Sequence, residues 1–116
     1  MIVRVILAAV TMACCATPAL AHAFLQHAEP GAGAALKAAP RRLALTFSET
    51  LEPAFSGVAV TDGSGRSVAA GAVVISGKAI VAPLRPLPPG RYRVTWHVVS
   101  VDTHRTEGAY SFMVTP

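Results

Sequence analysis

Apolar and polar residues alternate along several short segments of this chain, and the alternation predicts β-strands. In residues 42–49, Leu43, Leu45 and Phe47 occupy every second position, with small or polar residues between them. A hydrophobic period of two places such side chains on one face of a half-buried strand. The same period recurs in residues 56–62, so the first half of the chain carries repeated strand signals and only weak helical ones.

The longest predicted strand covers residues 91–100, and a second strong one covers residues 108–115. One face of this pair is apolar, with Tyr92, Val94, Trp96 and Val98 from the first strand and Tyr110, Phe112 and Val114 from the second. Because residues i and i+2 of a strand share a face, these side chains are predicted to be buried, with Trp96 between two sheets. The opposite, polar face of the first strand carries Arg91, Arg93, Thr95 and His97.

Shorter strands are expected on both sides of Gly71 and within residues 78–84. The proline-rich residues 86–90 are expected to connect strands, because proline cannot join a central ladder. Residues 33–39 are predicted to be a loop or a single turn, since Gly and Pro bound them closely. About seven short strands in one small domain predict an all-β, two-layer antiparallel sandwich.

The first 21 residues have the layout of a secretory signal peptide. Arg4 precedes an apolar run, and Ala19-Leu20-Ala21 supplies a small-residue cleavage motif. A retained membrane anchor is the alternative, but the apolar run is shorter than the roughly 20 residues that a bilayer span needs. We therefore predict a signal peptide at residues 1–21 and one mature domain at residues 22–116.

Composition narrows the chemistry that the mature residues can perform. Both cysteines, Cys14 and Cys15, fall in the predicted leader, so residues 22–116 have no thiol for a disulfide, a soft-metal site or nucleophilic catalysis. Nine Lys/Arg and six Asp/Glu give this part a formal charge of +3. The basic residues are scattered along the sequence, so we predict no nucleic-acid partner. A Ser-His-Asp arrangement, a phosphate loop and an HExxH motif are also absent from the sequence.

Cleavage after Ala21 would make His22 the first residue of the mature chain. His22 would then carry a free α-amine beside its imidazole, and both nitrogens could chelate one metal ion. An α-amine has a pKa near 8 in model peptides, so it yields its proton to a metal more easily than a lysine does. Such a nitrogen chelate suits Cu(II). The alternative is that cleavage leaves a histidine at this position without any role.

Asp102 and His104 form a D-x-H motif directly after the long predicted strand. On an extended segment, residues i and i+2 point the same way, so the carboxylate and the imidazole could converge on one ion. Together with the two nitrogens of His22 they would supply three nitrogens and one oxygen, which Cu(II) favours. The alternative is an ordinary turn, with Asp102 bonded to local amides and His104 exposed to solvent.

The other candidate residues have weaker signals. Glu49, at the end of a predicted strand, could orient a ligand or accept a bond from the amine, or could be a solvated acid. His97 and His27 are predicted to be surface residues of strands. Met113 is the only methionine in residues 22–116, so a thioether cluster for Cu(I) cannot form.

Three segments carry a family resemblance, and together they cover most of the mature residues. They are AHAFLQHAEPGAGAAL at residues 21–36, APRRLALTFSETLEPAF at residues 39–55 and GRYRVTWHVVSVDTHRTEGAYSFMV at residues 90–114. With a histidine after the signal cut, the LTFSE strand and the pattern W-x-V-V-S-x-D-x-H, the chain resembles the CopC/PcoC family of periplasmic copper-resistance proteins. The resemblance implies an immunoglobulin-like or cupredoxin-like Greek-key β-sandwich or barrel in residues 22–116.

The resemblance also implies one Cu(II) ion bound by His22, Asp102 and His104, with Glu49 near the site as a weaker contributor. The implied protein is periplasmic, and a CopD-like inner-membrane copper transporter is its expected partner. We separately expect the domain to be a monomer. Two departures from the family pattern stand out. Thr103 replaces the glycine that many members have between the Asp and the His, and the methionine-rich Cu(I) loop of some members is missing. A Cu(II)-only member is therefore expected.

Two other functions are compatible with the same residues. A copper oxygenase resembling lytic polysaccharide monooxygenases would also use an N-terminal histidine chelate, but Asp102 would fill a position that oxygen needs. A metal-free immunoglobulin-like interaction domain would use none of the three candidate ligands. We predict a binding protein for copper sequestration, delivery or resistance, and not an enzyme.

Overall fold

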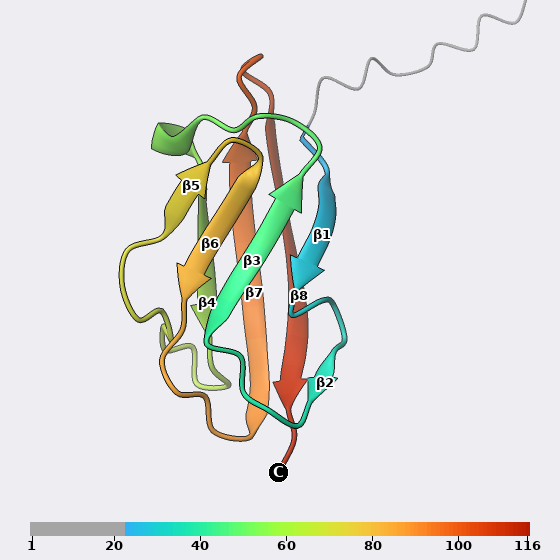
Figure 1. Ribbon diagram of the computed structural model, residues 1–116, viewed down its shortest axis with the longest axis vertical. Helices are drawn as coiled ribbons and strands as arrows, with labels where there is room; N and C mark the ends of the chain where they lie inside the picture. Colours follow the sequence, from blue (N-terminus) through green and yellow to red (C-terminus); the bar gives the residue numbers. More distant parts are fainter. Residues whose placement is uncertain (1–22) are drawn as a thin grey trace, which may run out of the picture.

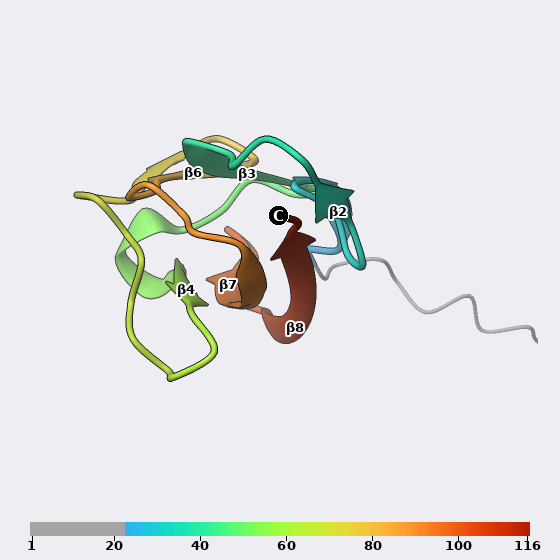
Figure 2. The ribbon, with the colours of Figure 1, turned by 90° about the horizontal axis from the view of Figure 1, so that it is seen from below.

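The computed structural model describes residues 23–116, and these residues form two β-sheets stacked face to face (Figures 1 and 2). The strands are β1 (Leu25–Glu29), β2 (Ala35–Leu36), β3 (Arg42–Phe47), β4 (Gly57–Thr61), β5 (Val74–Ser76), β6 (Ala79–Pro83), β7 (Gly90–Val99) and β8 (Arg105–Val114). One short 3₁₀ helix, η1 (Pro53–Phe55), lies between β3 and β4. The predicted all-β, two-layer architecture is confirmed.

One sheet has the strand order β1-β3-β6-β5, and the other has the order β2-β8-β7-β4. The pairs are antiparallel except β2 with β8, which is parallel, so the expectation of a wholly antiparallel sandwich is wrong at this edge. Residues 33–39 are not only a loop, because β2 lies within them. The strand expected before Gly71 is reduced to isolated bridges at Ser67 and Ala69, and the strand after it is β5.

The core lies between the sheets and is built by most of the predicted alternating positions, whereas Trp96 and Tyr110 are only half-buried and pack against it. Leu43, Leu45 and Phe47 of β3 are fully buried, as are Val94 and Val98 of β7. The Phe47 ring meets the half-buried Trp96 edge-on, with ring centroids 5.2 Å apart, and so joins the two sheets. Edge-on packing is a favoured aromatic geometry. Burial of one face of each strand explains why the period of two could be recognised in the sequence.

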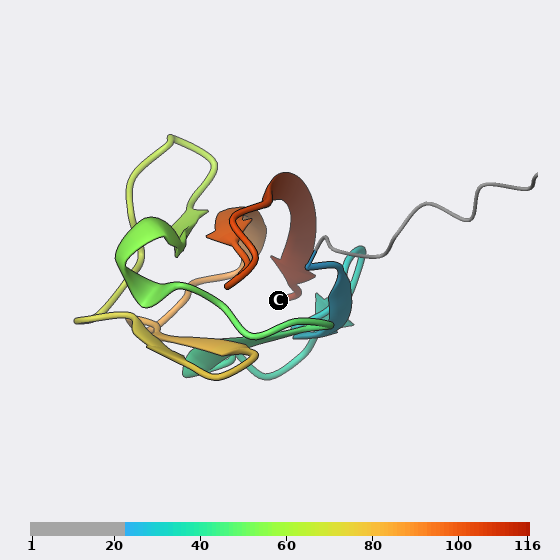
Figure 3. The same cartoon turned by 90° about the horizontal axis from the view of Figure 1, so that it is seen from above.

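The hairpin of β7 and β8 projects from one end of the sandwich. Seen from above, the tip of this hairpin shares that end with the start of β1 and with the segment that follows β3 (Figure 3). Hydrogen bonds tie these segments together, since the Val101 amide donates to the Thr50 carbonyl (3.1 Å) and the Ser48 amide donates to the Phe24 carbonyl (2.8 Å). Within residues 23–116, no helix is long and apolar enough to cross a membrane.

Candidate metal centre

The tip of the β7–β8 hairpin is a tight loop of residues 101–103. The Ser100 amide donates to the His104 carbonyl (3.0 Å), and the Thr103 amide donates to the Ser100 carbonyl (2.8 Å). Thr103 has a φ of 74°, in the left-handed region. A turn followed by a left-handed residue is a common way to close a three-residue hairpin loop. The D-x-H motif therefore occupies a turn and not an extended segment.

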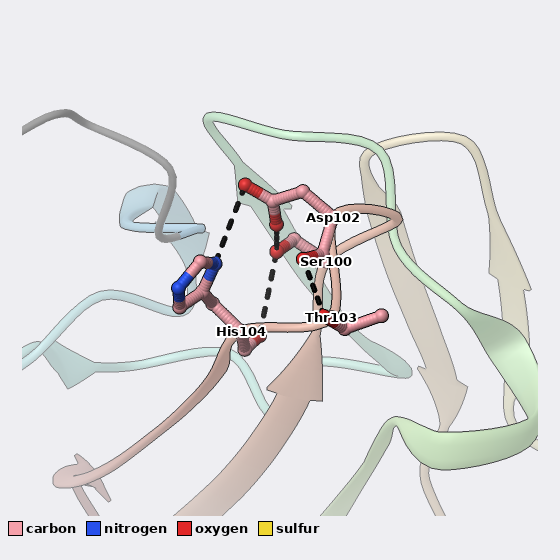
Figure 4. Close-up of polar contacts among 4 residues, drawn as sticks. All are labelled: Ser100, Asp102, Thr103 and His104. Carbon is pink, nitrogen blue, oxygen red and sulfur yellow. Dashed lines mark hydrogen bonds and ion pairs between the residues drawn. The ribbon is translucent and has the colours of Figure 1, made fainter.

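The turn brings the Asp102 carboxylate and the His104 imidazole together (Figure 4). His104 Nδ1 lies 3.5 Å from Asp102 Oδ2, and both side chains are accessible, with 49% and 42% of their surfaces exposed. The predicted convergence of the two groups is thus observed, but the reason given for it is wrong. Alternation along a strand does not produce it, because the left-handed Thr103 reverses the backbone between the two residues.

The position of Thr103 leads to a stability prediction. A left-handed conformation costs a non-glycine residue roughly 1–2 kcal/mol, and part of the gain from glycine is offset by the greater freedom of the unfolded chain. We expect Thr103→Gly to raise the free energy of unfolding by about 0.5–1 kcal/mol, as measured by chemical denaturation without metal. Thr46→Gly, on the exposed face of the extended strand β3, is the matched control and is expected to destabilise. Equal losses at both positions would contradict this explanation.

The Asp102 carboxylate is held in its ionised form. A hydrogen bond from the Ser100 hydroxyl is the main cause that lowers the pKa of Asp102, and the neighbouring His104 adds to the effect, while desolvation opposes it. A metal ligand must be deprotonated to bind. Asp102 therefore offers an anionic oxygen throughout the range above its ordinary pKa, and it loses this form only under more acidic conditions.

The beginning of the described chain is anchored beside the same turn. Ala23 is fully buried, and its carbonyl accepts a hydrogen bond from the Thr106 hydroxyl (2.8 Å). The Phe24 amide donates to Ser48 Oγ (2.8 Å). Thr106 is two residues beyond His104, so residue 23 lies at the hairpin end of the sandwich. His22, the residue before Ala23 in the sequence, lies outside the described residues.

The remaining histidines and Glu49 occupy separate places. Glu49 follows Ser48 at the same end of the sandwich and is half-buried, but no hydrogen bond or ion pair joins it to Asp102 or His104 within the described residues. His97 is exposed on the outer face of β7, over Gly57, as predicted. His27 is exposed on β1, where its Nε2 lies 3.4 Å from Glu29 Oε1.

The two donors at the turn fit a first-row metal ion, although they make only part of a site. Bonds from such an ion to nitrogen or oxygen are about 2.0–2.2 Å long, so two donors on one ion lie roughly 2.8–4.2 Å apart. The 3.5 Å between His104 Nδ1 and Asp102 Oδ2 falls in this range. Among residues 23–116, no group of three or more His, Cys, Asp and Glu side chains is arranged to hold a metal. A complete site would therefore need donors in addition to the Asp102 carboxylate and the His104 imidazole.

The sequence did not single out three residues that hold the turn or the start of the chain beside it. Thr106 and Ser48 anchor the start of the chain, and Ser100 contacts Asp102. For Ser100 a signal was present, because alternation places it on the inward face of β7 with Trp96 and Val98. A polar residue at a core position requires a hydrogen-bond partner.

The fold and the site define a class: a small two-sheet β-domain that presents an Asp–His pair at one end, beside the start of the domain. Comparison with known proteins gives the family. Residues 25–115 match the family model described as the CopC domain, and the chain belongs to the CopC family.

Individual relatives and solved structures agree with this assignment. Protein YobA from Escherichia coli is 43% identical over 103 residues, which cover 84% of this chain and 83% of that protein. The crystal structure of CopC from Methylosinus trichosporium OB3b has a TM-score of 0.75 at 32% identity and covers 82% of this chain and 95% of that one. The crystal structure of PcoC, a methionine-rich copper resistance protein from Escherichia coli, has a TM-score of 0.70 at 39% identity and covers 82% of this chain and 100% of PcoC.

A longer relative contains a similar segment. The copper transport protein CutJ from Bacillus subtilis is 30% identical over 98 residues, which cover 81% of this chain but only 18% of CutJ. Most of CutJ therefore lies outside the region that resembles this chain.

Proposed function

We propose that this protein binds one Cu(II) ion in the periplasm and sequesters it or delivers it to a partner. The ligands are the α-amine and imidazole of His22, the carboxylate of Asp102 and the imidazole of His104. The observation that carries the proposal is the approach of His104 Nδ1 to Asp102 Oδ2, 3.5 Å apart at an exposed turn. Membership of the CopC family supports copper as the metal.

The anchoring of Ala23 supports the part assigned to His22. The hydrogen bond from Thr106 to the Ala23 carbonyl fixes the chain one residue after His22, at the end of the domain that carries the turn. The α-amine and the imidazole of one residue form a closed chelate ring without any help from folding. A preformed Asp–His pair and a terminal chelate together give three nitrogens and one oxygen, a donor set suited to Cu(II).

The donor set also favours binding over catalysis. Four protein donors would occupy the strong binding positions that Cu(II) prefers, which would leave only weak positions for a reacting molecule. Met113 is the only methionine after the proposed cleavage site, and it lies on the outer face of β8, exposed. PcoC is described as methionine-rich, whereas residues 22–116 of this chain offer a single thioether as a soft donor. We propose a Cu(II) protein without a Cu(I) site.

The partner and the compartment follow from the same proposal. A signal peptide at residues 1–21, which lie outside the described residues, would export the domain to the periplasm. CutJ is named a copper transport protein, and its similar segment is a small part of a much longer chain. This arrangement supports a CopD-like inner-membrane copper transporter as the protein that receives the ion from a monomeric carrier.

The experiment that tests the proposal compares two N-termini. The full chain is secreted and its processed form is purified, with the first residue determined by mass spectrometry. A second form carries one additional residue ahead of His22, which locks the amine in a peptide bond but keeps the imidazole. We expect the form that begins at His22 to bind one Cu(II) with nitrogen-rich EPR splitting. The extended form is expected to bind more than about 100-fold more weakly, because it loses a ligand and not merely a group that orients one.

The other outcomes contradict specific parts of the proposal. Equal binding by the two forms would show that the amine is not a ligand. If the signal peptidase cleaves at a position other than after Ala21, His22 has no free α-amine, and the amine again cannot be a ligand. If neither form binds Cu(II), the metal-free interaction domain becomes the better description.

A further inference from the structure

Ser100 is the one polar or charged residue among residues 23–116 whose surface is completely buried. It directly follows β7 and continues the line of inward-facing residues Val94, Trp96 and Val98, immediately before the turn. A buried hydroxyl is costly unless its hydrogen-bonding capacity is used. The contacts of this side chain therefore explain why a serine can occupy a core position here.

The Ser100 hydroxyl contacts the turn that carries the candidate ligands. It donates to Asp102 Oδ1, and its Oγ also lies 3.3 Å from the His104 carbonyl oxygen (Figure 4). The backbone of Ser100 bonds to the same turn, donating to the His104 carbonyl and accepting from the Thr103 amide. The serine thus connects the rigid end of β7 with the exposed Asp102 side chain.

The two oxygens of Asp102 consequently have different environments. Oδ1 faces the buried hydroxyl, whereas Oδ2 faces His104 Nδ1 at 3.5 Å. We propose that Ser100 is a positioning residue for copper: it holds Oδ1 so that Asp102 binds the ion through Oδ2 alone, in a fixed orientation toward His104. This inference rests on the proposed function, because it assigns Ser100 a role in that same site.

The energetic reason is preorganisation. An exposed aspartate rotates freely about its side-chain bonds, and a ligand loses this freedom when it binds a metal. A hydrogen bond from a buried donor removes part of that freedom before the ion arrives. Partners that orient metal ligands in this way are typically worth about 10–100-fold in metal affinity.

The test compares Ser100→Ala with a matched serine that lies nearby and does not touch Asp102. Ser56 Oγ accepts a hydrogen bond from the Val99 amide (3.0 Å), so Ser56→Ala also removes a hydroxyl that supports the end of β7. In the processed protein, we expect Ser100→Ala to weaken Cu(II) binding about tenfold or more and to alter the EPR spectrum. Ser56→Ala is expected to retain the affinity within about threefold. Equal affinity in the wild type and in Ser100→Ala would overturn the role of Ser100.

A double-mutant cycle separates positioning from general support of the fold. If Ser100 acts through Asp102, then Ser100→Ala has no further effect on affinity when Asp102 is already alanine. A second loss of tenfold in that background would instead mean that Ser100 supports the domain without orienting the carboxylate, and would overturn the inference.

A measurement on the unmutated protein decides the question if Ser100→Ala does not fold. The chain has two aspartates, Asp62 and Asp102, so carbon-13 labelling of aspartate followed by an infrared difference spectrum between copper-bound and copper-free protein isolates the ligand. A monodentate carboxylate signature is expected, and a bidentate one would overturn the proposal. Wild-type protein that binds no Cu(II) would overturn the proposed function itself, whereas wild-type binding that needs Asp102 but not Ser100 overturns only this inference.

Discussion

Replacing Asp102 or His104 by alanine is expected to weaken Cu(II) binding by more than about 100-fold while leaving the domain folded. Loss of a group that merely orients a ligand costs about 10–100-fold, and loss of the ligand itself should cost more. Both side chains are about half exposed, so their truncation removes little buried surface. The measurement is a competition titration with Cu(II), with the thermal unfolding of the copper-free variants as a check on folding.

The chain provides a matched control for these two variants. His27 and Glu29 are also two residues apart, and their side chains approach to 3.4 Å on the exposed edge strand β1. This pair therefore has the same chemistry and spacing as the pair at the turn. We expect His27→Ala and Glu29→Ala to bind Cu(II) like the wild type. If His27→Ala lowered the Cu(II) affinity as much as His104→Ala, the metal site would lie on β1 and not at the turn.

Gly108→Ala is expected to destabilise the copper-free domain by about 1–3 kcal/mol. A Cβ at Gly108 would lie 2.5 Å from Cζ2 and 2.8 Å from Cε2 of the Trp96 ring. The Trp96 ring packs edge-on against Phe47 of the opposite sheet. It therefore cannot move away from an added Cβ without disturbing the core. In a domain of this size, each kcal/mol corresponds to a fall in Tm of about 4–8 °C.

Gly57→Ala is the control for this prediction, because the same added carbon meets a different neighbour. Its Cβ would lie 2.9 Å from the edge of the His97 ring, which is exposed and can rotate away. We expect Gly57→Ala to change the free energy of unfolding by less than about 0.5 kcal/mol, as for most surface substitutions. Equal losses at both glycines would mean that the loss of a strand glycine is sufficient to destabilise the domain, and that the packing of Trp96 is not the reason.

The predictions for Asp102 and His104 and for Gly108 all concern the β7–β8 hairpin. The β7–β8 hairpin has Trp96 over Gly108 near its middle and the Asp–His turn at its tip. Packing of the ring against Phe47 fixes the hairpin to the other sheet, and the sheet then carries the turn. A rigid scaffold is what a preformed pair of ligands requires.

Several features of the fold could be predicted from the sequence, because they depend on local order. Burial of one strand face imposes a period of two, so Leu43, Leu45 and Phe47 could be identified as core residues before the sheets were known. The residue types also limited the chemistry: no cysteine and a single methionine after residue 21 leave nitrogen and oxygen as metal donors. Asp102 and His104 could be selected as a candidate pair from their spacing, although a turn and not an extended segment brings them together.

Tertiary structure decided how these residues are arranged, since the decisive contacts join distant positions. Ala23 is anchored by Thr106, 83 residues later in the chain, and Phe24 is anchored by Ser48, 24 residues later. The hairpin register determines that the turn begins after Ser100 and that Thr103 is left-handed, which brings the carboxylate and the imidazole together. Hydrophobic alternation indicates which face of a strand is buried, but it does not indicate which loops lie together at one end of the sandwich. That outcome depends on the packing of the two sheets as a whole.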